Sequence, residues 1–195
     1  MKQFIGVFIV LISLASMTLK HQDHYGVDTK KSKITWTGEK VTGKHMGNVS
    51  ISKGRISINH GNIAAVSLKV DMNSITDEDI KSDKYNKMLV DHLKSEDFFD
   101  VKKFPEASFK MLNSKQSAKG HIVNGELTIK DKTHPVTLTV KIVYNETGIV
   151  VLGDMVFDRT KYGIIYKSGN FFESLGDKMI YDEVKLRFEI MASKK

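Results

Sequence analysis

Apolar residues recur at every second position along most of this chain, and no other feature restricts the fold as strongly. A period of two is the spacing of a β-strand that buries one face. Four segments have it most clearly, through Val66, Leu68, Val70 and Met72, through Val136, Leu138, Val140 and Ile142, through Ile149, Val151, Met155 and Phe157, and through Val184, Leu186, Phe188 and Ile190. The sequence therefore predicts a chain built mainly of amphipathic strands.

One segment has the spacing of a helix instead. Tyr85, Met88, Leu89, His92 and Leu93 fall on one face of a 3.6-residue period, and acidic residues precede them where a helix would begin. The pattern predicts an all-β domain with one or two short helices. We expect about eight strands, arranged as an antiparallel eight-stranded barrel, with a two-layer sandwich as the alternative.

Local patterns set the expected breaks between strands. The apolar phase changes across Lys53 and Gly54, as a tight turn or a bulge would require, and we interpret the change as two strands. Asn124-Gly125 alone is typical of a hairpin turn, but the apolar phase continues through it, which favours one unbroken strand over that turn. Residues 131–135 are polar, end in proline and predict a turn. Gly125 and Gly153 fall on inward positions, and their missing side chains predict free space inside the barrel. At Gly153 a close approach or a bend is also expected.

Residues 1–20 have the order of an export signal. Lys2 is followed by an apolar stretch over residues 4–14 and then by small residues, so cleavage is expected near residues 15–20, with Ala15 as one candidate position. The apolar run is shorter than the roughly 20 residues of a spanning helix. We expect a periplasmic or secreted bacterial protein with its barrel domain in residues 25–192, and an uncleaved N-terminal anchor is the alternative.

Composition excludes several classes of function. The chain has no cysteine, so disulfides, thiolate metal sites and cysteine nucleophiles are excluded. The sequence contains no metalloprotease, serine-hydrolase, phosphate-loop, dinucleotide or EF-hand motif. Its net charge of +7 is spread among 23 acidic residues without interleaved aromatics, which argues against a nucleic-acid partner. No enzymatic activity, metal site or cofactor is predicted.

Three polar residues suit more than one role. His92 has four acids around it in residues 91–100, yet its place on the apolar helix face favours packing over metal binding. His45 lies between two glycines and is expected to be a hydrogen-bonded structural residue more than a ligand contact. Arg159 closes a strong strand, where an internal ion pair or loop brace is favoured over a bound anion.

Eight short motifs follow one another along the chain. They are Tyr25-Gly-Val-Asp28, Ser32-x-Ile34-x-Trp36-x-Gly38, Gly43-Lys-His45-x-Gly47, His92-Leu-x-Ser-x-Asp97-Phe98-Phe99, Phe104-Pro105-x-Ala107-x-Phe109, Gly125-x-Leu127-Thr128-Ile129, Pro135-Val-x-Leu138 and Asp158-Arg159-x-x-Tyr162-Gly163. In this order they resemble the YceI-like family of exported bacterial proteins. Where that family commonly has a glycine after the Leu-Thr-Ile run, this chain has Asp131, a turn change that leaves the interior unaffected.

The resemblance implies a lipocalin-like barrel whose apolar tunnel takes a polyisoprenoid or another long-chain amphiphilic lipid. Members of the family share no single established reaction, so the resemblance implies binding more firmly than a physiological role. The leading hypothesis is therefore non-enzymatic transport or storage of such a lipid. The alternatives are a ligand-free stress-related or partner-binding barrel module, and a hydrolase or isomerase that acts on an isoprenoid lipid.

On this hypothesis nine residues form the tunnel wall, namely Trp36, Leu89, Phe98, Phe99, Phe109, Leu138, Val140, Phe157 and Phe188. A positive surface at the mouth favours a phosphate head group, for which His45, Arg159 and Lys161 are the candidates. Transient contact with a membrane surface is expected. The oligomeric state stays open, a dimer included.

Overall fold

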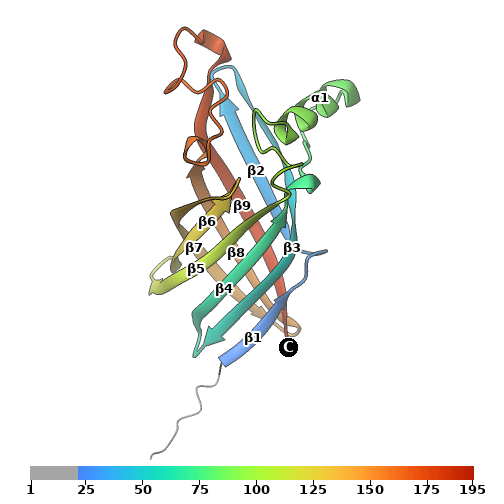
Figure 1. Ribbon diagram of the computed structural model, residues 1–195. Helices are drawn as coiled ribbons and strands as arrows, with labels where there is room; N and C mark the ends of the chain where they lie inside the picture. Colours follow the sequence, from blue (N-terminus) through green and yellow to red (C-terminus); the bar gives the residue numbers. More distant parts are fainter. Residues whose placement is uncertain (1–21) are drawn as a thin grey trace, which may run out of the picture.

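The computed structural model describes residues 22–195, which form a barrel with one projecting helix (Figure 1). The export signal predicted for residues 1–20 lies outside the described residues. The strands are β1 (Gln22–Val27), β2 (Lys33–Lys40), β3 (Gly43–Asn59), β4 (Asn62–Asp71), β5 (Glu106–Ser117), β6 (Gly120–Ile129), β7 (Lys132–Asn145), β8 (Gly148–Asp158) and β9 (Ile180–Lys194). The helices are α1 (Asp83–Lys94) and the 3-10 turns η1 (Met72–Ser74), η2 (Arg159–Tyr162) and η3 (Gly176–Lys178).

Eight strands close the barrel. They are hydrogen-bonded in the order β3-β2-β9-β8-β7-β6-β5-β4, and β4 pairs back with β3. Every pairing in the ring is antiparallel. The closed ring confirms the predicted antiparallel eight-stranded barrel and excludes the sandwich, and it leaves no open sheet edge along the ring.

The ninth strand, β1, completes the sheet where β2 does not reach. Tyr25 of β1 lies opposite Ile56 of β3 on one side and Lys194 of β9 on the other. At the other end of the barrel β2 takes the same place between β3 and β9, with Trp36 opposite Gly47 and Leu186. β1 and β2 thus lie between the same two strands, β3 and β9, at opposite ends of the barrel. This explains why the chain has one strand more than the eight of the ring.

The apolar residues that recur at every second position of the sequence form the inner face of the barrel. Leu68, Val140, Val151 and Ile190 are buried in one continuous apolar core, while the polar residues beside them are exposed. Burying one such side chain contributes about 1.5–3 kcal/mol to stability. The inward faces predicted for the four clearest strands are therefore confirmed.

The predicted break at Lys53-Gly54 is wrong. β3 runs without interruption from Gly43 to Asn59, and its register against β4 shifts between Ile51 and Lys53. An extra residue in one strand moves the side chains that follow to the opposite face, so a bulge produces the same change of phase as a turn.

The other two local predictions have mixed outcomes. β6 runs through Asn124-Gly125, as predicted. The turn predicted for residues 131–135 is shorter and begins earlier, because Lys130 and Asp131 form it alone and Pro135 lies within β7. Both turn residues have positive φ, 50° and 57°, which is the geometry of a two-residue hairpin turn that follows the twist of its strands.

Both long connections lie at one end of the barrel, here called the loop end (Figure 1). The connection between β4 and β5 carries η1 and α1, and the connection between β8 and β9 carries η2 and η3. β1 and the C-terminus lie at the opposite end. The predicted helix is confirmed as α1, and none of the helices in residues 22–195 is long and apolar enough to span a membrane.

Candidate functional site

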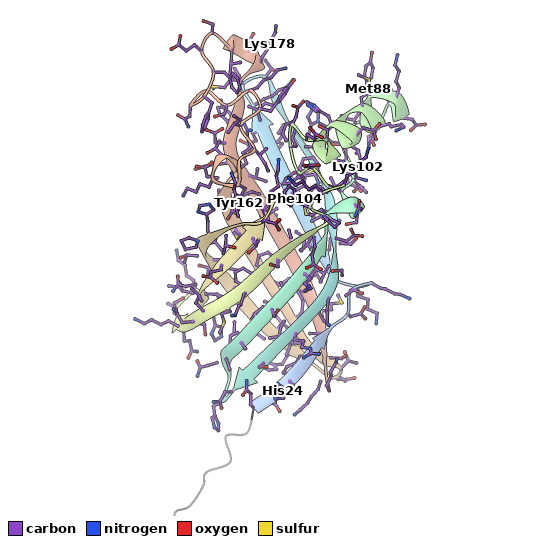
Figure 2. All side chains as sticks on the ribbon, viewed as in Figure 1. His24, Met88, Lys102, Phe104, Tyr162 and Lys178 are labelled. Carbon is purple, nitrogen blue, oxygen red and sulfur yellow. The ribbon has the colours of Figure 1, made fainter. Side chains whose placement is uncertain are left out.

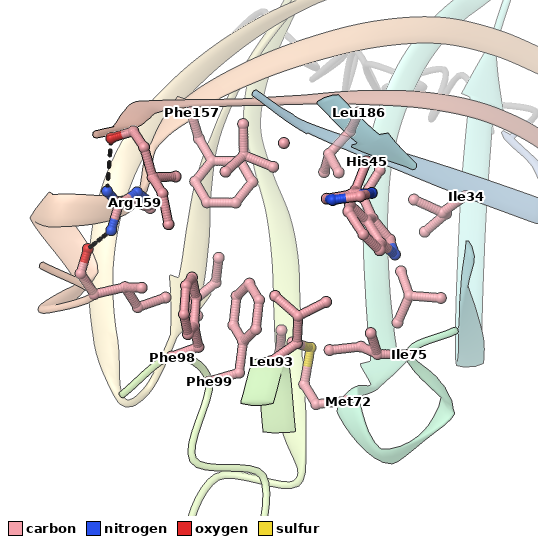
Figure 3. A pocket seen from close by; sticks show the side chains of 18 of the residues that line it. Ile34, His45, Met72, Ile75, Leu93, Phe98, Phe99, Phe157, Arg159 and Leu186 are labelled. Carbon is pink, nitrogen blue, oxygen red and sulfur yellow. Dashed lines mark hydrogen bonds between the residues drawn. The ribbon is translucent and has the colours of Figure 1, made fainter. Parts of the chain in front are cut away.

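A cavity of about 190 Å³ lies inside the loop end of the barrel (Figure 3). Its apolar lining includes Trp36 of β2, Leu89 and Leu93 of α1, Phe98 and Phe99 after α1, Phe157 of β8 and Leu186 of β9. Apolar cavities of about 150 Å³ take up molecules of the size of benzene. This cavity, the loop-end cavity, therefore has room for an apolar ligand.

A second cavity of about 90 Å³ lies further along the barrel and is called the deep cavity. Its lining is apolar except for Ser108. Five residues line both cavities, namely Ile34, Val70, Ala107, Leu127 and Leu186. The two cavities are therefore neighbours, and a long ligand can occupy both if these shared side chains move apart.

All nine residues predicted as tunnel wall line one of these cavities. Trp36, Leu89, Phe98, Phe99 and Phe157 line the loop-end cavity, and Phe109, Leu138, Val140 and Phe188 line the deep cavity. Alternation within strands located four of them, Leu138, Val140, Phe157 and Phe188, because inward positions of a closed sheet converge on one interior. Their contact with a ligand stays a prediction.

The free space expected beside the inward glycines is occupied. A Cβ atom added at Gly125 would lie 2.5 Å from the ring of Phe109, and one added at Gly153 would lie 2.5 Å from the ring of Phe188. Each glycine accommodates an aromatic ring from a neighbouring strand, so the predicted free space is wrong, whereas the close approach expected at Gly153 is confirmed. The cavities lie elsewhere because the rings fill the space that the missing side chains leave.

Helix α1 contributes only part of its predicted apolar face to the interior. Leu89 and Leu93 line the loop-end cavity, whereas Tyr85 and Met88 are 61% and 57% exposed. Part of the apolar face of α1 is therefore exposed, because the helix covers the rim of the barrel and does not lie flat on a core.

His92 has the packing role that its position favours. Its ring meets Phe98 and Tyr166 edge-on, at centroid distances of 4.9 and 4.7 Å, and its Nε2 lies 3.0 Å from Asp97 Oδ2. His92 belongs to no cluster of metal-ligating side chains in the described part of the chain. His92 therefore packs between Phe98, which follows α1, and Tyr166, which follows η2, and stabilises this group of aromatic rings.

Arg159 lines the loop-end cavity, but its donors are used inside the protein. The side chain is 3% exposed, and its nitrogens donate to the carbonyls of Ile164, Ile180 and Tyr181 at 2.7 to 3.1 Å. Its Nη2 also lies 3.2 Å from Asp182 Oδ1. The arrangement corresponds to the internal brace favoured from sequence, and dashed lines in Figure 3 mark hydrogen bonds of this group.

The brace continues into the connection between η2 and η3. Asp182 Oδ2 accepts hydrogen bonds from Ser168 Oγ at 2.9 Å and from Asn170 Nδ2 at 2.7 Å, and Ser168 is fully buried. One arginine and one aspartate thus attach this connection to the first residues of β9. The connection holds Ile164 in the cavity wall.

The other head-group candidates differ in position. His45 lines the loop-end cavity (Figure 3), whereas Lys161 is exposed and lines neither cavity. Lys40 and Glu39 also line the loop-end cavity and were not predicted. The register of β2 against β9 shifts between Gly38 and Lys40, so simple alternation cannot assign these two side chains.

His45 faces a segment that extends the sheet beyond β4. The Thr76 N–H donates to the Asn48 carbonyl at 3.0 Å, and the Glu78 N–H donates to the Met46 carbonyl at 2.9 Å. A Cβ atom at Gly47 would overlap the Thr76 carbonyl, so glycine is required there for the close approach. The segment brings two acids of residues 77–79 to His45.

Lys130 fixes the turn that follows α1. Its Nζ donates to the Phe98 carbonyl at 2.8 Å and to the Glu96 carbonyl at 3.3 Å. Burial lowers the pKa of this ammonium group, and the nearby Asp100 opposes the shift. The β6–β7 turn therefore holds the cavity-wall residue Phe98 in place through its backbone.

The geometry defines a class of protein, a closed antiparallel β-barrel with an apolar interior and a loop-covered end. The YceI-like domain profile matches residues 25–192, and the chain belongs to this family. A curated relative, a UPF0312 protein of Yersinia enterocolitica, is 34% identical over 98 residues, 49% of this chain and 47% of that protein. A UPF0312 protein of Photorhabdus laumondii is 36% identical over 52 residues, 27% of each chain. The alignments span about half the length, or less, of these relatives.

Solved structures share the fold at low sequence identity. Burkholderia cenocepacia BcnA has a TM-score of 0.66 and 23% identity, over 84% of this chain and 98% of that one. A protein described as a polyisoprenoid binding domain, from Saccharophagus degradans, has a TM-score of 0.57 and 16% identity, over 88% of this chain and 98% of that one. At these sequence identities, the structural similarity shows a shared barrel fold and nothing more specific.

Proposed function

We propose that this protein is a non-enzymatic carrier or storage protein for a polyisoprenoid or a similar long-chain amphiphilic lipid, in the periplasm or outside the cell. One observation carries the proposal: two neighbouring cavities with almost wholly apolar linings lie inside one closed barrel. Each CH₂ group that leaves water for such a lining contributes about 0.8 kcal/mol. The name of the Saccharophagus degradans neighbour, a polyisoprenoid binding domain, supports the same class of ligand.

The polar residues around the loop-end cavity fit the head of an amphiphile. Lys40 and His45 line this cavity together with Glu39, and the chain carries a net charge of +7. In a protein with this net charge, a lysine beside an apolar interior favours a phosphate head at the rim and a hydrocarbon chain inside. We assign head-group contact to Lys40 and to Nε2 of His45, since His45 Nδ1 is paired with Asp79 and the donors of Arg159 already have partners within the protein.

Native mass spectrometry of the mildly purified protein tests the proposal. We expect a population that carries one noncovalent adduct with the mass of a long-chain lipid. Extraction of that lipid should lower the melting temperature, because a ligand bound only to the folded state adds about 2.7 kcal/mol at one hundred times its Kd. A bare mass and a melting temperature insensitive to added lipid would instead support a ligand-free module. Turnover of the added lipid would support the hydrolase or isomerase.

Exposed apolar side chains at the loop end fit contact with the membrane that supplies the lipid. Tyr85 and Met88 project from α1, and Phe171 and Phe172, 55% and 45% exposed, project from the connection between η2 and η3. Figure 2 places Met88 and Lys178 at this same end of the molecule. Aromatic and apolar groups that stand beside lysines suit the surface of an anionic bilayer.

Co-sedimentation with phosphatidylglycerol vesicles tests this contact. We expect the double variant Tyr85→Ser with Met88→Ser to bind these vesicles several-fold more weakly than the wild type. The matched control is Val143→Ser with Tyr144→Ser, an exposed apolar pair of β7 near the opposite end, which should leave binding unchanged. Equal losses in both double variants would contradict docking through the loop end.

A further inference from the structure

Three metal-ligating side chains meet beside the rim of the loop-end cavity. His45 comes from β3, and Asp77 and Asp79 come from the segment between η1 and α1, with one ligand atom of each within 4.8 Å of the others. His45 Nδ1 and Asp79 Oδ2 lie 3.0 Å apart. His45 precedes Asp77 by 32 positions in the sequence, so only the fold brings it to the two acids.

Hydrogen bonds from the protein hold both carboxylates in place. Asp79 Oδ1 accepts from the Met46 N–H at 2.7 Å. Asp77 Oδ1 accepts from the Ile80 N–H at 2.9 Å and from Asn86 Nδ2 at 3.1 Å. This arrangement fixes both acids, as outer hydrogen bonds do around metal ligands. It leaves Asp77 Oδ2 without a partner, while Asp79 Oδ2 lies within hydrogen-bond distance of His45 Nδ1.

One carboxylate oxygen of Asp77 has no hydrogen-bond partner. The residue is 7% exposed, and its Oδ2 is buried without a hydrogen-bond partner. Among residues 22–195 no lysine or arginine forms an ion pair with Asp77 or Asp79, and the imidazole of His45 is the side chain that lies beside Asp79 Oδ2 there. A buried carboxylate oxygen without a hydrogen-bond partner carries a free-energy penalty. A cation beside Oδ2 would remove this penalty.

We propose that His45, Asp77 and Asp79 bind a divalent first-row transition-metal ion of the Zn²⁺ class. One imidazole nitrogen and two carboxylate oxygens suit such an ion, whereas Ca²⁺ and Mg²⁺ prefer oxygen ligands alone. Two ligand atoms bound to one Zn²⁺ lie roughly 3.0–3.5 Å apart, which the pair of His45 and Asp79 already matches at 3.0 Å. The two carboxylates neutralise the charge of the ion.

An ion can reach this site from solvent. The side chains of His45 and Asp79 are 36% and 34% exposed, while Asp77 closes the inner side. Three protein ligands leave at least one coordination position for water. The alternative occupant of the same geometry is a proton shared between the two carboxyl groups, which would satisfy Asp77 without a metal.

Titration calorimetry with Zn²⁺ alone, on the full chain purified without a histidine tag and stripped of metal, tests the proposal. We expect one site in the wild type that Asp77→Asn weakens at least tenfold, with His45→Gln as a second variant of the same effect. Zn²⁺ should also raise the melting temperature of the wild type and not that of Asp77→Asn. Asp97→Asn is the matched control, because His92 and Asp97 form an exposed pair, also 3.0 Å apart, without a buried third carboxylate.

Two outcomes would overturn the proposal. Absence of any Zn²⁺ site in the wild type would leave the shared proton as the partner of Asp77. Equal weakening of Zn²⁺ binding by Asp77→Asn and Asp97→Asn would indicate binding to scattered surface groups. Both readouts are independent of lipid, so failure here leaves the proposed carrier function untouched.

Discussion

Replacement of Arg159 with methionine is expected to lower the free energy of unfolding by about 3–5 kcal/mol, the range for breaking a buried ion pair by removing one partner. The change leaves Asp182, 16% exposed, without the cation 3.2 Å away. It also removes the donors to the carbonyls of Ile164, Ile180 and Tyr181. Urea denaturation followed by circular dichroism measures the loss.

A second arginine provides a matched control for this experiment. Arg187 of β9 pairs with Asp154 at 2.9 Å, but the two side chains are 82% and 68% exposed. Solvent screens such a pair, so Arg187→Met should change stability by less than about 1 kcal/mol. If Arg159→Met cost no more than Arg187→Met, the brace at the loop end would not be required for stability.

The second large effect concerns the interior itself. Ala107 is 6% exposed and lines both cavities, so Ala107→Phe would place a ring where they meet. We expect retained lipid per protein, measured by native mass spectrometry, to fall at least tenfold. The added ring enters existing free space, and overpacking should cost no more than about 1–3 kcal/mol.

The matched control places the same ring outside the barrel. Ala65 of β4 is exposed and lines neither cavity, so Ala65→Phe should leave lipid retention unchanged. Val140→Arg, which puts an unpaired charge on the wall of the deep cavity, should abolish retention as well. Full retention by a folded Ala107→Phe variant would mean that lipid binds elsewhere.

Strand positions were predictable because alternation is a local property. Leu68, Val140 and Ile190 point into the barrel, as their period of two requires. Helix α1 (Asp83–Lys94) contains all the residues of the predicted helical face. Prediction was wrong where one residue changes the phase without ending the strand. The bulge of β3 near Lys53 has this effect. The register of β2 also shifts between Gly38 and Lys40, and Glu39 and Lys40, which line the loop-end cavity, were not predicted.

Two features required the packed structure. Gly125 and Gly153 predicted free space, but Phe109 and Phe188 from neighbouring strands fill it. No local pattern specifies which ring enters which gap, because that choice depends on cross-strand register. The cluster of His45, Asp77 and Asp79 was likewise unpredicted, since its members meet only after the segment beyond β4 packs along β3.

The sequence by itself determined the class of fold, the inward face of the main strands and the apolar character of the interior, because side-chain alternation and hydrophobic burial act along the chain. The tertiary structure alone decided how that interior divides into two cavities, which charged groups are already paired and which remain at the rim. Those outcomes depend on distances between strands that are remote in sequence, and packing sets these distances only when the barrel closes.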